Sequence, residues 1–384
     1  MATPKLRFKE FDGDWANFNL GDISDIKTGP FGSTLHQKDY VEIGTPIITV
    51  EHLGEVGLTS QNLPLVSDED KVRLKSYMLD EGDLAFSRVG SVDRCAIITD
   101  KEKGWLFSGR ILRVRPNKKL VHSKNLMYAL KTEDAKYRIR SVAVGQTMPS
   151  LNTEILKNFS INLSNSVEEQ TKIASFLSAV DEKISQLTQK HELLSQYKQG
   201  MMQKLFSQQI RFKADDGSEF GEWEETTLGA LYNIGSSKRV LQEDWKSKGI
   251  PFLRTREIIS LIDKTNFSSP IFIAEKLYDE LTNKYGAIKE NDILVSGVGT
   301  VGKAYIVKAS DKFYFKDGNV IWLRSKELNN SRFIYYFFQS HIMENYFVSN
   351  KSITTVDTFT IDQAKKVKLL NPSIEEQTKI ANFL

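Results

Sequence analysis

The glycine-rich run from Gly297 to Lys303 is the segment whose residue types most suggest chemistry. Its pattern fits G-x-G-x-x-G and most of G-x-x-x-x-G-K-[ST], in which backbone amides bind phosphate groups. Ala304 stands where the Mg²⁺-binding serine or threonine is required, and Tyr305 to Val307 favours a strand where a phosphate loop needs a helix. We therefore predict a tight turn between two strands, and a nucleotide-dependent enzyme is the least favoured function.

No other group of residues forms a catalytic pattern. The five histidines are scattered and Cys95 is the single cysteine, so no cluster has the spacing of metal ligands. The G-x-S-x-G elbow of serine hydrolases does not occur either. The sequence therefore predicts a protein that is not an enzyme and that binds no metal or cofactor of its own.

The composition is that of an ordinary soluble globular chain. The 384 residues are 40% hydrophobic and 26% charged, and this length predicts two domains or three. A net charge of +3 is too small to prove a nucleic-acid partner, although it does not repel one. One cysteine permits no internal disulfide, and no stretch approaches about 18 uninterrupted apolar residues, so we expect a cytoplasmic protein without a membrane span.

Several blocks of the sequence occur twice along the chain, with an offset of about 205 positions. The repeated blocks are Arg7–Lys9 with Arg211–Lys213, Trp15 with Trp223, Ser87–Val92 with Ser296–Val301, and Val167–Leu177 with Ile374–Leu384. Between these blocks the two copies differ, as residues 27–32 and 233–239 show. A common scaffold that carries two unlike sets of loops is typical of one fold that binds two different ligands.

Each copy reads as an α+β module in which short strands precede a helix. The predicted strands are 45–50, 82–87, 95–99 and 110–115 in the first copy, and 250–254, 292–296, 304–307 and 320–324 in the second. The predicted helices are 124–137 and 332–346. We divide the chain into module 1 (1–165), a central spacer helix (166–207), module 2 (208–372) and the start of a distal spacer helix (373–384).

The central helix carries the clearest local signals. Ser166 and Glu169 form a capping box, in which the serine caps an amide and the glutamate reaches back, and Ser373 and Glu376 repeat it. Apolar residues then alternate steps of four and three, which predicts a coiled coil about 60 Å long. The predicted helix-pairing seam is Ile173, Leu177, Val180, Ile184, Leu187, His191, Leu194, Met201 and Leu205, with Lys198 as a second polar member. We expect the second copy to supply the antiparallel partner helix. The sequence contains that helix from Ser373 to Leu384.

Two variable modules that open on Arg-Phe and Trp blocks and close on a Glu-Glu-Gln-Thr-Lys-Ile-Ala helix resemble the specificity subunit of Type I restriction-modification enzymes. The resemblance covers the whole chain and rests on the helix copies at Val167 and Ile374, the turns at Ser87 and Ser296, and residues 145–147 ahead of Leu151. In that family the distal helix normally continues further than it does here.

The resemblance implies a non-catalytic reader of double-stranded DNA. Each module would be a target recognition domain that grips one half of a bipartite, asymmetric site, and the helices would set the spacing and bind methyltransferase subunits, probably two. A restriction and translocase subunit would join for cleavage. S-adenosylmethionine, ATP and Mg²⁺ are then expected on these partner subunits and not on this chain.

The residues that could touch DNA are basic or polar side chains in loops that differ between the copies. They are Lys27, Lys38, Arg88, Arg110 and Gln146 in the first module, and Lys238, Arg239, Arg254, Arg256, Lys303 and Lys351 in the second. Arginine and glutamine suit the edges of guanine and adenine, whereas lysine more often meets phosphate. The alternative function is a scaffold whose two modules bind protein ligands on either side of a coiled-coil spacer.

Overall fold

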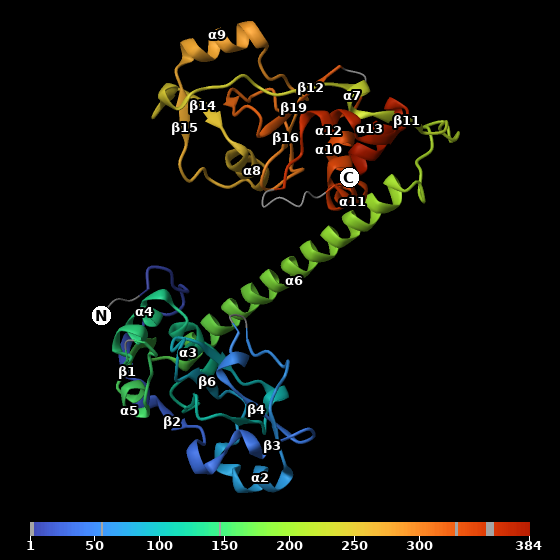
Figure 1. The fold of residues 1–384 in the computed structure, drawn as a ribbon. Coiled ribbons are helices and arrows are strands. Elements are labelled where there is room, and N and C mark those ends of the chain that lie inside the picture. Colours follow the sequence, from blue (N-terminus) through green and yellow to red (C-terminus); the bar gives the residue numbers. More distant parts are fainter. Residues whose placement is uncertain (1–3, 55–56, 146, 327–328, 351–356) are drawn as a thin grey trace. The chain divides into compact units, whose positions relative to one another are not determined.

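The computed structural model describes residues 4–54, 57–145, 147–326, 329–350 and 357–384. The chain forms two compact units, Met1–Leu187 and Thr188–Leu384, and the boundary between them falls inside the long helix α6 (Val167–Phe206). Figure 1 shows this helix and the elements of each unit. The sequence-based division differs in treating the helix as a segment of its own.

The first unit contains three sheets and five shorter α-helices among its described residues. In chain order its elements are β1 (Trp15–Asn19), α1 (Leu20–Ile23), β2 (Ser24–Thr28), β3 (Tyr40–Val41), β4 (Thr45–Ile48), β5 (Leu65–Val66), α2 (Asp68–Arg73), β6 (Leu84–Ser87), β7 (Cys95–Ile97), β8 (Leu106–Phe107), β9 (Ile111–Pro116), α3 (Ser123–Leu130), α4 (Glu133–Val142), α5 (Thr153–Lys157) and β10 (Ser160–Ser164).

Two four-stranded sheets organise this unit. The first is antiparallel with the order β2-β9-β6-β7, and the second has the order β3-β5-β4-β8, in which β4 and β8 run parallel. Strand β6 is buried at every position because both faces of its sheet are covered. One face packs on α3 and α4 through Leu126 and Ile139, and the other face packs on β4 and β8 through Ile48 and Phe107.

The second unit repeats this arrangement. Its elements are β11 (Glu224–Thr227), α7 (Leu228–Leu231), β12 (Tyr232–Gly235), β13 (Trp245–Lys246), β14 (Ile250–Leu253), α8 (Thr255–Asp263), β15 (Ile271–Ile273), α9 (Glu275–Tyr285), β16 (Ile293–Ser296), β17 (Ala304–Ile306), β18 (Tyr314–Phe315), β19 (Val320–Ser325), α10 (Ser331–Gln339), α11 (His341–Ser349), α12 (Ile361–Lys366), β20 (Lys368–Asn371) and α13 (Ile374–Phe383).

The sheets of the second unit have the orders β12-β19-β16-β17 and β13-β15-β14-β18, with β14 parallel to β18. These orders match those of the first unit strand for strand. The predicted tandem duplication of an α+β fold is therefore confirmed, and so are all eight predicted strands, apart from one or two residues at their ends.

The two helices predicted inside the modules were wrong in one respect, because each is interrupted. Thr132 stands between α3 and α4 with an extended backbone (ψ 148°), and its Oγ1 accepts a hydrogen bond from the N–H of Ala135 (3.3 Å). Ser340 plays the corresponding part between α10 and α11 (ψ 158°), where its Oγ donates to the carbonyl oxygen of Phe337 (2.7 Å). The apolar pattern runs across both interruptions and concealed them.

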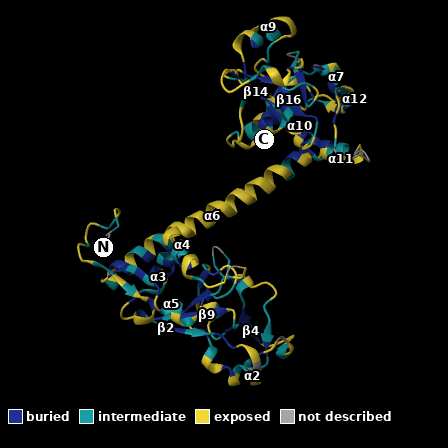
Figure 2. Cartoon of the chain, turned by 60° about the vertical axis from the view of Figure 1, so that its left-hand side comes forward, coloured by how far each residue is buried: buried dark blue, intermediate teal, exposed yellow. Residues whose placement is uncertain are grey.

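The long helix forms as predicted, with 40 residues in one piece. Its first turns pack into the first unit, where Glu169, Gln170 and Ala174 are buried. Its last turns enter the core of the second unit, where Leu205 and Phe206 are buried. Residues 179–199 are all exposed, as Figure 2 shows along the middle of α6.

Candidate nucleic-acid interface

The turn between β6 and β7 is held by a serine at the end of the first strand. The Oγ of Ser87 donates to the carbonyl oxygen of Ser91 and accepts a hydrogen bond from the N–H of Arg94 (3.2 Å). Ser296, its copy, makes the same two bonds four and seven residues further on (2.5 and 2.9 Å). The turn is therefore a shared part of the scaffold, and it presents residues 88–94 and 297–303 at the same edge of each unit.

This geometry settles the structure of the glycine-rich run from Gly297 to Lys303. Gly299 and Gly302 adopt positive φ angles (80° and 83°), which glycine adopts without strain. Strand β17 follows directly and no helix begins there, so the run forms the predicted turn between two strands.

Arg88 holds three loops of the first unit together. Its Nη1 donates to the carbonyl oxygen of Gly109 (2.9 Å), and its Nε donates to that of Leu151 (3.3 Å). Its guanidinium group also lies over the ring of Phe31, 5.7 Å from the centroid. These contacts use two of the five N–H donors of the guanidinium group, so Arg88 braces the three loops with only part of its donor capacity.

The loop before α5 is tied to the same turn. The N–H of Gly90 donates to the carbonyl oxygen of Pro149 (2.9 Å), and Val144 and Ser150 exchange backbone hydrogen bonds (2.9 Å each). Val144 and Met148 expose more than 60% of their surface on this loop. Gln146, which the sequence nominated here, lies outside the described residues.

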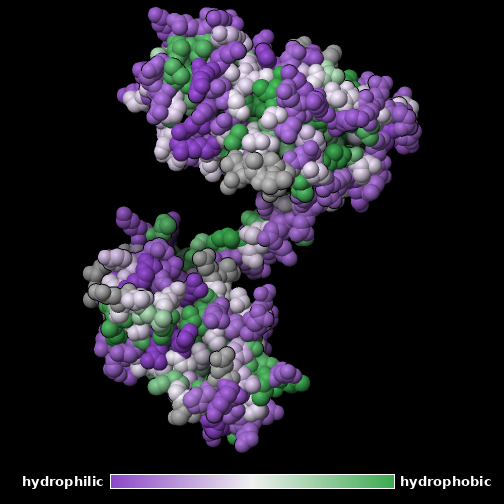
Figure 3. Space-filling model, viewed as in Figure 1, coloured by the Kyte–Doolittle hydropathy of each residue, from purple (hydrophilic) through white to green (hydrophobic). Residues whose placement is uncertain are grey.

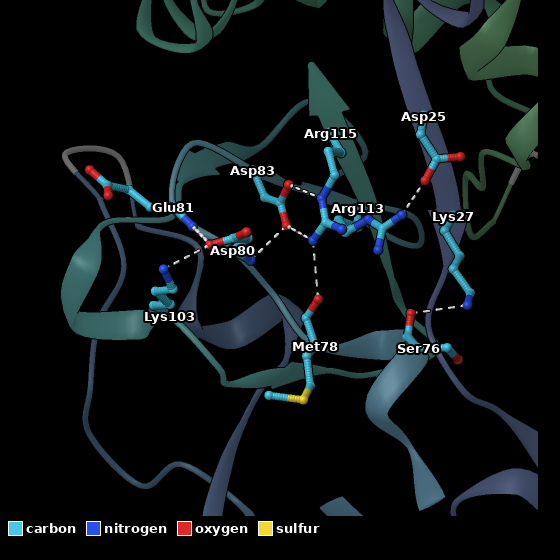
Figure 4. A network of polar contacts seen from close by, with 10 residues as sticks. All are labelled: Asp25, Lys27, Ser76, Met78, Asp80, Glu81, Asp83, Lys103, Arg113 and Arg115. Carbon is cyan, nitrogen blue, oxygen red and sulfur yellow. Dashed lines mark hydrogen bonds and ion pairs between the residues drawn. The ribbon is translucent and has the colours of Figure 1, made fainter. Parts of the chain in front are cut away.

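Lys27 is half-buried in a polar network on β2, which Figure 4 shows. Its Nζ donates to the carbonyl oxygen of Ser76 (3.0 Å) and lies 4.2 Å from the centroid of the Tyr77 ring. Burial lowers the pKa of Lys27, and the nearby cation of Arg113 lowers it further. The side chain is engaged within the fold and is a poor candidate for a DNA contact in this conformation.

Sequence reasoning missed the two arginines beside it on β9. Arg113 is buried and forms an ion pair with Asp25, while Arg115 donates from Nε and Nη2 to the carboxylate of Asp83 (2.7 Å each). Figure 4 shows both pairs. The alternation of arginine with apolar residues in Ile111–Pro116 was the available signal, because alternate strand residues point to opposite faces.

Arg254 and Arg256 were nominated for DNA contact in the second unit, and in the structure both bind Glu257. Arg254 donates from Nη2 to Oε1 (2.7 Å) and Arg256 donates from Nε to the same oxygen (2.6 Å). Burial alone would raise the pKa of Glu257, but the two guanidinium groups outweigh burial and hold the pKa below its usual range. The three side chains fix the start of α8.

The remaining nominated side chains that the structure describes are exposed. They are Lys38 and Arg110 in the first unit, and Lys238, Arg239 and Lys303 in the second. Lys238 lies over the ring of Tyr285, 5.1 Å from the centroid. Lys351 lies outside the described residues.

A buried ion pair explains why the first and last blocks of each repeat occur together. Arg7 donates from Nε and Nη2 to the carboxylate of Glu169 (2.6 and 2.7 Å), and that carboxylate is fully buried. Arg211 binds Glu376 in the same way (3.1 and 2.8 Å). The ion pair fastens the N-terminal arm of each unit to the first turn of the helix that follows it.

The same contacts correct the predicted capping boxes. Ser166 does cap the N–H of Glu169 (3.2 Å), and Ser373 caps that of Glu376 (3.3 Å). Each glutamate side chain, however, turns to its arginine and does not return to the backbone of the capping serine. The charge of a guanidinium group makes it a stronger donor than a backbone amide.

The predicted seam of α6 divides into three parts. Ile173 and Leu177 are partly buried against the first unit, and Leu205 is buried in the second, with Met201 partly buried beside it. The middle of the seam is exposed, and its members are Val180, Ile184, Leu187, His191 and Leu194. Lys198 lies over the ring of Tyr336, 4.6 Å from the centroid. Figure 3 shows hydrophobic surface on the part of α6 that leaves the first unit.

The described residues form neither a metal-ligand cluster nor a membrane-spanning helix. Within 4–54, 57–145, 147–326, 329–350 and 357–384, no three acidic, histidine or cysteine side chains gather as metal ligands would. In the same ranges no helix combines the length and apolar content needed to cross a bilayer.

Comparison with known proteins identifies the duplicated unit. The family model described as the Type I restriction modification DNA specificity domain matches the chain twice, at residues 12–196 and 221–384. Two similar proteins come from Methanocaldococcus jannaschii. The putative type I restriction enzyme MjaX specificity subunit is 28% identical over 99% of this chain and 88% of its own, and the MjaVIII specificity subunit is 25% identical over 98% and 88%.

The fold agrees with a solved structure. The S subunit of a Type I restriction-modification system from M. genitalium superposes with a TM-score of 0.62 at 18% identity, over 99% of this chain and 91% of that one. The two α+β units share one topology, and each is followed by a helix whose first turn holds the same arginine–glutamate ion pair. These features define a protein built from two copies of one specificity domain. The chain belongs to the family of Type I restriction-modification DNA specificity subunits.

Proposed function

We propose that this chain is the sequence-specific DNA recognition subunit of a Type I restriction-modification complex. Each unit reads one half of a bipartite, asymmetric site, and the helices set the distance between the halves. The observation that carries this proposal is the pairing of one topology with two unlike sets of loop and strand residues. A protein that bound the same ligand twice would have no reason to diverge there.

The strand register supports this divergence position by position. Arg113 on β9 lies opposite Lys27 and Ala85, and the corresponding residue on β19, Trp322, lies opposite Gly235 and Leu294. Arg113 pairs with a carboxylate, whereas Trp322 donates from Nε1 to the buried carboxylate of Asp292 (2.8 Å). The two units thus share the same strand pairing at this position but carry different side chains on it.

The partners of the chain follow from the same proposal. The exposed middle of α6 offers an apolar face for helix pairing and for methyltransferase subunits, probably two, and a restriction and translocase subunit completes the complex. This chain is non-catalytic, so S-adenosylmethionine, ATP and Mg²⁺ bind the partners. The protein acts in the cytoplasm, where its DNA is. Family membership does not favour the alternative of a protein-binding scaffold.

The decisive experiment is co-expression with the cognate methyltransferase subunit, followed by mapping of methylated adenines across the host genome. We expect a two-part motif with a fixed gap, and we expect it to vanish when this chain is omitted. Methylation that persists without the chain, or a motif without a gap, would overturn the proposal.

Salt dependence separates DNA recognition from a scaffold role. Phosphate contacts release counterions, so the logarithm of the DNA binding constant should fall steeply and linearly with the logarithm of salt concentration. A complex whose DNA affinity does not change with salt would contradict the proposed interface.

A further inference from the structure

An aromatic side chain projects from the loop after β2 in the first unit. Phe31 exposes 63% of its surface, while Gly29 and Pro30 directly before it are buried. Single exposed apolar residues are common on proteins and need no explanation by themselves. The position of Phe31 becomes informative because the loop that carries it is held firmly.

The loop that carries Phe31 packs closely against the backbone of residues 108 and 109. A Cβ atom on Gly29 would lie 2.2 Å from the carbonyl oxygen of Ser108, and one on Gly109 would lie 2.7 Å from the Cβ of Phe31. Beyond the aromatic residue, Arg73 donates from Nη1 to the carbonyl oxygen of Thr34 (2.7 Å). The ring is therefore presented to solvent at a set place.

The surroundings of the ring are cationic. The guanidinium group of Arg88 lies 5.7 Å from the ring centroid and is itself held by Gly109 and Leu151. Arg110, next to Gly109, is exposed. An aromatic ring in contact with one arginine, with a second exposed arginine directly after Gly109, matches the chemistry of a DNA surface, where cations contact phosphates and apolar groups contact bases.

The second unit has a cation on the loop that follows the corresponding strand. Lys27 and Gly235 occupy the same register position in their sheets, and Phe31 and Arg239 each follow four residues later. Arg239 is exposed as well. The loop that follows this strand thus exposes an aromatic ring in one unit and a guanidinium group in the other.

We propose that this loop determines specificity in both units: Phe31 makes apolar contact with the bases of one half-site, and Arg239 donates hydrogen bonds to a guanine of the other. This inference rests on the proposed function and deepens it. Apolar contact discriminates through shape and the thymine methyl group, whereas arginine donates two hydrogen bonds to O6 and N7 of guanine.

The test uses the complex of the full chain with its methyltransferase subunit and a duplex that carries the mapped motif. Equilibrium binding is measured over a range of NaCl concentrations. Phe31→Ala should weaken binding by about fivefold or more without changing the salt slope. Arg239→Ala should also weaken binding by about fivefold or more.

Duplexes with single base changes in each half-site add a second readout. Phe31→Ala should relax discrimination only in the half read by the first unit, and Arg239→Ala only in the other half. Phe31→Trp should retain affinity because it keeps an aromatic face. Ile43→Ala, which removes a side chain 89% exposed in the same unit, should leave binding unchanged.

The outcomes are distinguishable. If the wild-type complex binds its motif and Phe31→Ala matches it in affinity and half-site discrimination, the inference is wrong and the proposed function stands. A Phe31→Ala variant with a lower salt slope would also overturn it, since the ring carries no charge. If the wild-type complex shows no motif-specific binding, both the proposed function and the inference fail.

Discussion

Glu169 and Glu376 occupy a position whose residue type alone predicts a helix cap, and each serves a longer-range contact. The carboxylate is fully buried in both copies, and an arginine from about 160 residues earlier neutralises it. A buried charge without such a partner would cost several kcal/mol. This requirement couples the two ends of each unit and accounts for the joint recurrence of their blocks.

Replacement of Glu169 by glutamine should therefore destabilise the first unit. We expect a loss of about 2 kcal/mol in the free energy of unfolding, because two charge-assisted hydrogen bonds become weaker and Arg7 loses its counter-charge. Denaturant unfolding measures the change. Glu168→Gln, a substitution at the exposed neighbouring residue, is the matched control. Equal stability of the two variants would show that the ion pair contributes nothing.

The same residue should make stability depend on pH. The hydrogen bond from Arg7 holds the pKa of Glu169 below its usual range, against the opposing effect of burial. Because the folded pKa lies below the unfolded value of about 4.3, the contribution is complete above that value and is lost as pH falls through the folded pKa.

Unfolding free energies measured between pH 6 and pH 3 test this sign. The wild type should lose more stability on acidification than Glu169→Gln, whose amide does not titrate. Parallel curves for the two proteins would contradict the assignment.

At the scale of the element, strands and repeats were predictable because their signals are local. Runs such as Val320–Ser325 are short and rich in β-branched and aromatic residues, which favours a buried strand. The interruptions at Thr132 and Ser340 were not predictable in the same way. Both residues occur inside helices as well as at caps, and the choice depends on the packing of the second helix against the core.

The candidate interface was predictable only in part, for a related reason. Arg254 and Glu257 are three residues apart, a spacing at which helical side chains meet, so their pairing could have been inferred. The partners of Arg88 lie 21 and 63 residues away, beyond the reach of any local pattern. Phe31 was missed because exposure of an apolar residue is a property of the fold.

The long helix allows a prediction about spacing. Removal of the seven residues 181–187 shortens α6 by about 10 Å and keeps the heptad pattern in phase. These residues are exposed and belong to neither hydrophobic core, although the deletion removes the hydrogen bond that Tyr128 donates to Asp181 (2.7 Å). Mapping of methylated adenines should show the same two half-sites with a gap shorter by about three base pairs, at roughly 3.4 Å per base pair. An unchanged gap would show that another part of the complex sets the distance.

At the scale of the whole molecule, each unit has its own cores and its own loops. The cores of the first unit draw only on residues up to Leu163, and those of the second begin at Met202. Stability and recognition can therefore change in one unit without a direct effect on the packing of the other. Duplication followed by divergence of the loops is consistent with this separation.

Exchange of one module tests that independence directly. Residues 213–372 would be replaced by the equivalent segment of a relative with a different motif, and methylated adenines would be mapped again. The junctions matter, because Phe206 on α6 packs on Phe333 and Phe337 inside the exchanged segment, with ring centroids 5.2 and 6.0 Å apart. A replacement segment with large apolar residues at the positions of Phe333 and Phe337 preserves this contact. A replacement segment with small residues at these positions is the control for a packing defect.

We expect the exchange to change one half of the motif and to leave the other half and the gap intact. The unchanged half depends on loops braced entirely within the first unit, as the contacts of Arg88 with Gly109 and Leu151 illustrate. A change in both halves would mean that the units read DNA jointly. The two units would then fold separately without recognising DNA separately. Loss of methylation with the small-residue replacement segment alone would instead place the defect at the helix junction, where the three aromatic rings meet.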